Sequence, residues 1–96
     1  MTQPDGQRID KWLWHARFAR TRAAAQKLAL SGHVRINRDK VSVASRLVRP
    51  GDVLTVALGE RVRVLRVRGV SERRGSYEQA RQLYEEAARP GSASES

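Results

Sequence analysis

Residues 8–37, RIDKWLWHARFARTRAAAQKLALSGHVRIN, decide the fold because their hydrophobic period changes partway along the stretch. In the first part, apolar residues recur every three or four positions, which is the spacing of one face of a helix. These residues are Ile9, Trp12, Leu13, Ala16 and Ala19. Asp10 is of the residue type that caps helix N-termini, and Ile9 and Trp14 have the spacing of a hydrophobic staple around it. The sequence therefore predicts a helix from about Asp10 to Phe18.

A second helix is predicted from Arg22 to Ser31. Thr21 can cap it by accepting a hydrogen bond from the first turn, and the Ala-rich segment that follows favours helix. The predicted buried stripe consists of Ala24, Ala25, Leu28 and Ala29. Gly32 stands where a helix commonly ends in a left-handed residue, which glycine adopts without steric cost. The small alanine side chains allow the two helices to approach closely.

Beyond Gly32 the hydrophobic period becomes two, as in a half-buried strand. Residues 33–37 alternate polar and apolar side chains, so we expect Val34 and Ile36 to point inward. The next predicted segments are a turn at 37–40, extended pieces at 41–43 and 46–48, a turn at 50–52, and strands at 53–58 and 61–70. In the last of these strands Val62, Val64 and Val67 are the apolar positions, and the alternation slips at Leu65, which favours a β-bulge there.

Ser76 and Gln79 have the spacing of a capping box at the start of a third helix, and helical spacing continues to Ala87. The sequence thus predicts an α+β fold: two short N-terminal helices packed on a small, mainly antiparallel β-sheet, with a C-terminal helix. We expect a single domain, in which residues 59–88 supply a strand and the last helix. Residues 1–7 are expected to be a disordered leader and residues 89–96 a disordered tail.

The positive charge is confined to one part of the chain. The 96 residues contain 19 Lys and Arg against 10 Asp and Glu, a net charge of +9. Residues 8–49 hold eleven of the basic residues and two of the acidic ones, so this segment carries the whole net charge. A solvated basic surface would explain the total, but this uneven distribution favours a face that binds a polyanion. Nucleic acid is the first candidate and an acidic membrane surface the second.

Catalysis and metal binding find little support in the sequence. The chain has no Cys, and neither of its two histidines, His15 and His33, has Asp or Glu at metal-ligand spacing. It has no glycine-rich phosphate loop, and Ser31, His33 and Asp39 form a combination that any chain of this size permits. We therefore expect no enzyme activity, no metal and no cofactor. No apolar run approaches the ~20 residues of a membrane span, and we expect a cytoplasmic protein.

Basic side chains of the two predicted helices and the following turn are the candidate binding residues. Arginine offers a planar fork that contacts phosphate oxygens in pairs, and free N–H groups at the start of the second helix add a place for phosphate. Charge and geometry select Arg17, Arg20, Lys27, Arg38 and Lys40, together with the residues named below from a family resemblance. If about five phosphates are neutralised, affinity should fall with salt at a log–log slope of roughly −3.5 to −4.5.

Two further groups of residues have two interpretations each. Trp14 and Phe18 lie off the main apolar stripe, and they either stack on unpaired bases or pack in the core, which we favour. The arginines of the last strand form either a second binding patch or, as we favour, a solvated strand face with ion pairs. They are Arg61, Arg63, Arg66 and Arg68.

Several pieces, in order, resemble the S4-type RNA-binding domain over about residues 8–58. That domain is shared by a small-subunit ribosomal protein, pseudouridine synthases and tyrosyl-tRNA synthetases. The matching pieces are Arg8-Ile9-Asp10-Lys11-Trp12-Leu13, Thr21-Arg22, Ala25, Gly32-His33-Val34-Arg35-Ile36-Asn37 and Pro50-Gly51-Asp52. The segments DKWLW and RFARTR, with the short length, are similar to the bacterial ribosome-associated heat shock protein 15 family.

The resemblance implies the alpha-L motif, in which two helices pack on a small sheet, and structured RNA as the ligand. It also implies that the second helix and the loop into the sheet face RNA. The positions of this chain that match are Arg8, Lys11, Thr21, Arg22, Gly32, His33, Arg35 and Asn37. Many relatives have Gly after the Asn of the strand-end turn, whereas this chain has Arg38, so we expect a turn of another type with an added charge.

The resemblance further implies a non-enzymatic protein that binds ribosomal RNA on the large subunit, in recycling of stalled subunits that carry a nascent chain and tRNA. One alternative is an RNA-targeting accessory subunit of a separate enzyme that modifies rRNA or tRNA. Another is a general DNA-binding protein, a weaker alternative because no helix shows a recognition pattern or a dimer seam. We expect rRNA as the partner, tRNA as a further one, no membrane, and a monomer.

Overall fold

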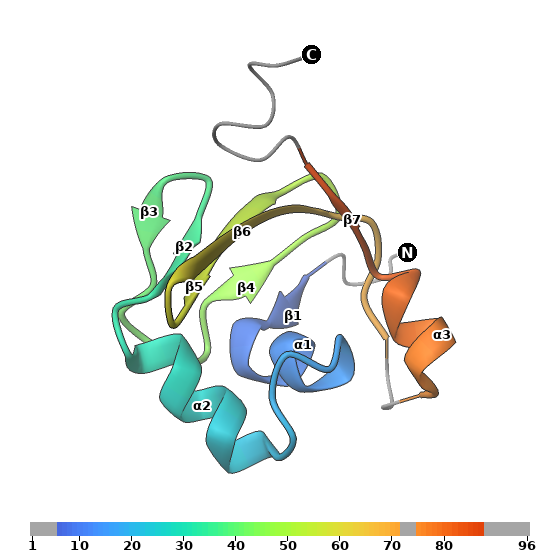
Figure 1. Cartoon of the computed structure of the whole chain (residues 1–96), viewed down its shortest axis with the longest axis horizontal. Helices are drawn as coiled ribbons and strands as arrows, with labels where there is room; N and C mark the ends of the chain where they lie inside the picture. The colour runs from blue at the N-terminus through green and yellow to red at the C-terminus, as the bar shows by residue number, and fades with distance from the viewer. Residues whose placement is uncertain (1–5, 72–74, 88–96) are drawn as a thin grey trace.

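The computed structural model describes residues 6–71 and 75–87 of the chain, and it confirms the predicted α+β class (Figure 1). These described residues form three helices and seven strands. In order they are β1 (Gln7–Arg8), α1 (Ile9–His15), α2 (Arg22–Leu30), β2 (Val34–Ile36), β3 (Asp39–Lys40), β4 (Leu47–Val48), β5 (Val53–Leu58), β6 (Arg61–Val67), α3 (Tyr77–Arg81) and β7 (Tyr84–Glu86).

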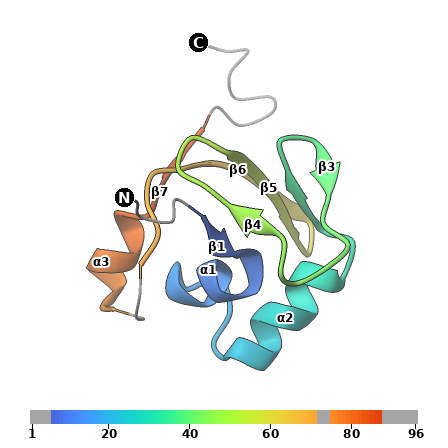
Figure 2. The same cartoon turned by 180° about the vertical axis from the view of Figure 1, so that it is seen from behind.

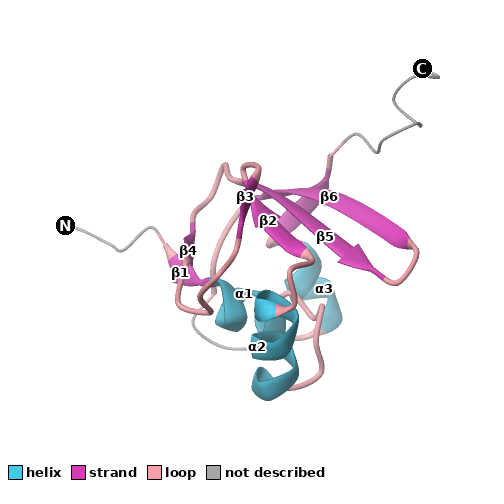
Figure 3. Ribbon diagram, turned by 90° about the vertical axis from the view of Figure 1, so that its left-hand side faces the viewer, coloured by secondary structure: helices cyan, strands magenta, loops and turns pink. Residues whose placement is uncertain are grey.

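Antiparallel pairing joins the strands into two sheets. The main sheet has five strands in the order β3-β2-β5-β6-β7, and the second consists of β1 paired with β4. Figure 3 shows the helices together on one side of the strands, and Figure 2 shows the small β1-β4 pair beside α1. The main sheet therefore has one face against the helices and one face towards solvent, which explains its alternating burial.

The core forms where α1 and α2 meet the inner face of the sheet. Trp12 is its largest member; it is 0% exposed and its indole Nε1 donates a hydrogen bond to the Gly69 carbonyl at 2.9 Å. Its ring stacks on Phe18 and meets Tyr84 edge-on, each at 6.1 Å between centroids. Aromatic pairs at such separations stabilise a core beyond the area they bury. A tryptophan of α1 thus ties the N-terminal helices to the C-terminal strand.

The N-terminal predictions hold for α2 and need correction for α1. Thr21 caps α2 by accepting a hydrogen bond from the Ala24 amide at 3.0 Å, and Gly32 has the expected left-handed φ of 90°. Ala25 and Ala29 are buried, but Ala24 is exposed, so the predicted stripe was one residue too wide.

Helix α1 begins at Ile9, because the N-cap is Arg8 and its side chain forms no capping bond. Asp10 therefore lies inside the first turn and does not cap the helix. Because a hydrophobic staple is defined by its positions around the N-cap residue, Ile9 and Trp14 do not form the predicted staple. The helix ends at His15, earlier than predicted, because Arg17 adopts a φ of 68° and the Phe18 amide donates back to the Leu13 carbonyl. Gln7, placed in the expected leader, instead pairs with Val48 in β1, whereas residues 1–5 lie outside the described part of the chain.

The hairpin of β5 and β6 has no bulge at Leu65. Its register is regular from Val53 opposite Arg66 to Leu58 opposite Arg61. Leu65 and Val67 are buried against the helices, and by the same alternation Arg63 also points to the inner face. Val62, expected inward, is 47% exposed. The slip in hydrophobic alternation therefore marks an arginine on the core side of a regular strand. The extended piece predicted at 41–43 is not a strand either, since β3 ends at Lys40.

The C-terminal helix is much shorter than predicted. Ser76 and Gln79 form the expected capping box, but α3 ends at Arg81. The segment Tyr84–Glu86 forms β7 and pairs with β6, although its sequence has helical spacing. Pairing with the free edge of β6 outweighs the weak local helix preference, because it satisfies the backbone groups of both strands. The expected tail, residues 89–96, lies outside the described residues.

Candidate nucleic-acid interface

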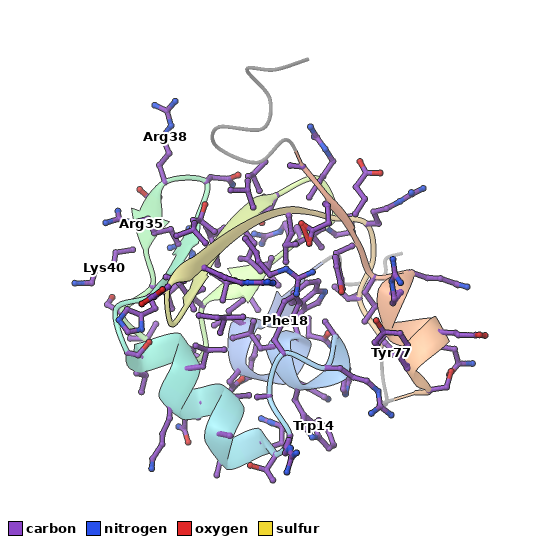
Figure 4. The ribbon with its side chains drawn as sticks, in the orientation of Figure 1. Trp14, Phe18, Arg35, Arg38, Lys40 and Tyr77 are labelled. Atoms are coloured by element: carbon purple, nitrogen blue, oxygen red, sulfur yellow. The ribbon has the colours of Figure 1, made fainter. Side chains whose placement is uncertain are left out.

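The hairpin of β2 and β3 presents three basic side chains at one end of the molecule. Its loop consists of Asn37 and Arg38, which both have positive φ, 53° and 87°. Two successive positive φ values are the mark of a type I′ turn, whose twist matches antiparallel strands. Arg38 thus occupies a conformation that favours glycine, so the expectation of another turn type was wrong. Figure 4 shows Arg35, Arg38 and Lys40 together there, and we call these three residues the basic hairpin.

Asn37 is exposed, but its side chain also holds the base of this hairpin. Its side-chain amide donates to the Asp52 carboxylate at 3.0 Å, and its side-chain oxygen accepts from the Val53 amide at 2.9 Å. Asp52 also accepts from the Arg49 amide at 2.9 Å, which fixes the turn before β5. Asn37 therefore fixes the turn that carries Arg38, and both ends of its side-chain amide form hydrogen bonds within the protein.

The C-terminal end of α2 lies beside the basic hairpin. A Cβ on Gly32 would lie 3.4 Å from the Lys40 side chain, so Lys40 packs closely along the Gly32 backbone. His33 follows directly and is exposed, with its amide hydrogen-bonded to the Ser31 hydroxyl at 3.2 Å. The structure thus brings Gly32 and His33 next to the basic hairpin, as their candidate roles require.

A second basic group forms where α1 meets the start of α2. The carboxylate of Asp10, 2% exposed, lies 3.0 Å from the Arg8 guanidinium and 3.5 Å from that of Arg22. Both arginines are only half-buried, so their outer N–H groups remain open to a ligand. Asp10 was assigned a capping role from sequence; the structure makes it the residue that positions two arginines.

The environment of Asp10 favours its charged form. Burial by itself would raise the pKa of this carboxyl group, but the hydrogen bond from Arg8 and the charges of Arg8 and Arg22 outweigh burial. Together with the Lys11 amide they hold the pKa of Asp10 below its ordinary value of 3.8. A carboxylate with a lowered pKa stabilises the folded state above its ordinary pKa, and this contribution is lost as the pH falls through the lowered value.

Replacing Asp10 with asparagine should therefore lower the free energy of unfolding near neutral pH by about 1–3 kcal/mol, the usual cost of losing buried charge-assisted hydrogen bonds. The difference from the wild type should shrink as the carboxylate of the wild type becomes protonated, below about pH 4. Urea unfolding at a series of pH values measures both effects. A difference that stays constant down to acid pH would show that the charge of Asp10 is not what stabilises the fold.

The other candidate binding residues do not all lie in one surface patch. Arg20 and Lys27 are exposed, Lys27 in the last turn of α2, while Lys11 is half-buried on α1. Thr21 uses its hydroxyl oxygen as the α2 cap. Arg17 points elsewhere, because its guanidinium donates to the Gly75 carbonyl, just before α3, at 2.8 Å. Arg17 therefore belongs to the α3 side of the molecule, a position that the charge count could not reveal.

The two open questions from the sequence are largely answered. Phe18 is a core-packed residue, since its ring contacts both Trp12 and Tyr84. Trp14 is half-buried against the core, with its ring 5.3 Å from that of His15 (Figure 4).

The arginines of β6, and Arg68 directly after it, are largely ion-paired, as favoured. Arg63 pairs with Glu86, and Arg66 and Arg68 pair with Glu85 at 3.6 and 3.3 Å. No such pair involves Arg61 among the described residues. Groups of three or more potential metal ligands are absent from residues 6–71 and 75–87, and none of the helices defined there is long and apolar enough to cross a membrane.

Comparison with known proteins places the basic hairpin and both helices inside a family model. The model of the S4 domain matches residues 7–54. Heat shock protein 15 of Escherichia coli K12 is 40% identical over 81 residues, which are 84% of this chain and 60% of that protein. The small ribosomal subunit protein uS4 of Novosphingobium aromaticivorans is 42% identical over 57 residues, 59% of this chain and 27% of that protein.

A solved structure of heat shock protein 15 from Vibrio cholerae has the same fold. It superimposes with a TM-score of 0.79 and 34% sequence identity, over 86% of this chain and 83% of that one. That structure is described as trimeric, so the comparison gives no support to the expected monomer. The chain spans about 60% of the length of the heat shock protein 15 sequences it matches.

Proposed function

The chain belongs to the S4 domain family, and within it to the heat shock protein 15 family; from this premise we propose that it binds structured ribosomal RNA on the large ribosomal subunit. It acts without catalysis, in the recycling of stalled subunits that still carry a nascent chain and tRNA. This role places it in the bacterial cytoplasm and in the stress response.

The observation that carries the proposal is the arrangement of basic side chains from α1 to the basic hairpin. Asp10 orients Arg8 and Arg22 at one end of α2, and Lys40 lies against Gly32 at the other end. A helix of nine residues is about 13 Å long, so the two groups are spaced to meet different phosphates of a folded RNA. Phosphate contacts position a protein on RNA without reading its sequence, which suits recognition of shape.

Sedimentation of the purified protein with ribosomal fractions tests this function. We expect co-migration with free large subunits on sucrose gradients, and more of it when those subunits retain peptidyl-tRNA. With isolated rRNA fragments, affinity should fall with salt at a log–log slope of roughly −3.5 to −4.5 for about five phosphates. Equal affinity for duplex DNA would contradict the proposal, and co-purification with an RNA-modifying enzyme but not with subunits would favour the accessory-subunit role.

The oligomeric state of the free protein needs a separate measurement. The trimeric relative from Vibrio cholerae makes a trimer the alternative to the expected monomer. Sedimentation equilibrium of the free protein measures the mass directly, against 10.8 kDa for one chain.

A further inference from the structure

A cleft on the α3 side of the molecule combines arginines with aromatic rings. It has a volume of about 320 Å³ and lies between the end of α1, strand β7 and helix α3. Its lining includes Arg17, Phe18, Arg63, Tyr77, Arg81 and Tyr84. Figure 4 shows Tyr77 on α3, across the molecule from the basic hairpin. The cleft is therefore separate from the candidate interface, and its volume falls at the small end of the range for ligand sites.

The acidic side chains that line the cleft are already paired with arginines. The guanidinium of Arg63 lies 5.0 Å above the Phe18 ring and 5.9 Å from the Tyr84 ring, and its Nε donates to Glu86 at 2.9 Å. Glu85, at the edge, pairs with Arg66 and Arg68. Both glutamates that line the cleft are thus neutralised by arginines of β6 and by Arg68 directly after it.

The rim of the cleft carries two arginines that are not neutralised by a carboxylate of the described residues. Arg17 and Arg81 form no ion pair within residues 6–71 and 75–87, and each belongs to a different wall of the cleft. Arg17 uses one of its N–H groups on the Gly75 carbonyl, so other donors of its guanidinium remain for an anion. Two such arginines facing one small cleft suit a single phosphate group.

Tyr77 supplies an aromatic surface between these charges. It is 61% exposed, the most exposed of the large apolar side chains among the described residues. The guanidinium of Arg81 lies 5.8 Å from its ring, which leaves much of the ring uncovered. An exposed ring beside arginines offers a stacking platform for a base, since every base has a flat face and a neighbouring phosphate.

We propose that this cleft binds one unpaired nucleotide, whose base stacks on Tyr77 and whose phosphate contacts Arg17 and Arg81. The proposal rests on the proposed function, because the nucleotide would be an unpaired residue of the same RNA that the basic hairpin binds. An acidic peptide would match the two charges but would leave the aromatic platform without a planar partner.

Titration of the full chain with the single-stranded RNA tetramer AAAA, followed by amide NMR shifts, tests the proposal. We expect the largest shifts at residues 16–18 and 77–84, and smaller ones at the basic hairpin, which contacts phosphates of any RNA. Tyr77→Ala should weaken binding of the tetramer about tenfold, within the range of one base stack, while Tyr77→Phe retains it. Arg81→Gln should weaken binding by a similar factor. Because Tyr77 and Arg81 are exposed, all three variants should keep the wild-type melting temperature.

Several outcomes would overturn the proposal. They are shifts confined to residues 33–40, an unchanged affinity of Tyr77→Ala, or equal shifts on titration with a tetraglutamate peptide. The proposed function fails separately: binding of AAAA at the cleft without binding of rRNA would refute that function and leave the nucleotide site. Conversely, rRNA binding with no shifts at the cleft would refute the nucleotide site alone.

Discussion

Replacing Trp12 with alanine should cost about 3–5 kcal/mol of the free energy of unfolding, which is a large part of the roughly 5–15 kcal/mol that stabilises a typical domain. The residue is 0% exposed, contacts the rings of Phe18 and Tyr84, and donates its Nε1 hydrogen to the Gly69 carbonyl. The change leaves a cavity between the helices and the sheet, and it removes the partner of a carbonyl near the end of β6. Urea unfolding followed by circular dichroism measures the loss.

Trp14→Ala is the matched control for this prediction. It removes the same side chain two residues away in α1, but from a half-buried position at the edge of the core. We expect Trp14→Ala to lower the free energy of unfolding by less than half as much as Trp12→Ala. The half-buried Trp14 removes less apolar surface from water on folding than Trp12 does. Equal losses for the two variants would mean that burial of Trp12 does not hold the helices to the sheet.

Replacing all three residues of the basic hairpin, Arg35, Arg38 and Lys40, with glutamine should weaken binding to ribosomal RNA by about a hundredfold to a thousandfold at moderate salt. Each side chain is exposed, so each can lose a phosphate contact without cost to the core. The log–log salt slope should become shallower by roughly two to three, about one for each contact removed. Fluorescence anisotropy with a labelled rRNA fragment at several salt concentrations measures both.

The control with the same change of charge replaces Arg61 and Arg66 of β6, and Arg68 directly after it, with glutamine. Two of these arginines pair with Glu85, so we expect a loss of affinity well below that of the basic hairpin variant. Similar losses would show that net charge alone, rather than the hairpin, determines affinity.

Arg38→Gly further separates charge from conformation. It should weaken RNA binding while raising the free energy of unfolding, because glycine tolerates the φ of 87°.

Local signals in the sequence predicted much of the fold. Thr21, Gly32 and the pair Ser76 and Gln79 act through bonds within a few residues, so their types and spacing were sufficient. The alternation at Val34 and Ile36 predicted β2 in the same way, since it reports burial on one face directly. The family resemblance then placed the helices and hairpin together.

Features that depend on distant partners could not be predicted. Arg63 points inward because it contacts Phe18, Tyr84 and Glu86 there, and those partners come from two distant segments, the loop after α1 and strand β7. The segment Tyr84–Glu86 forms a strand because β6 offers it an edge, against its helical spacing. Asp10 seemed a cap because its partner Arg22 is twelve positions away, and Arg17 seemed part of the patch because its contact with Gly75 is far along the chain.

The two edges of the main sheet have a consequence for aggregation. One edge is β3, with two residues, and the other is β7, with three, so each exposes very little unpaired backbone. Both edges also carry charges, Asp39 and Lys40 on one and Glu85 and Glu86 on the other. Short, charged edge strands are a natural protection against edge-to-edge pairing with other chains. The sheet is therefore built to resist growth into fibrils at high protein concentration.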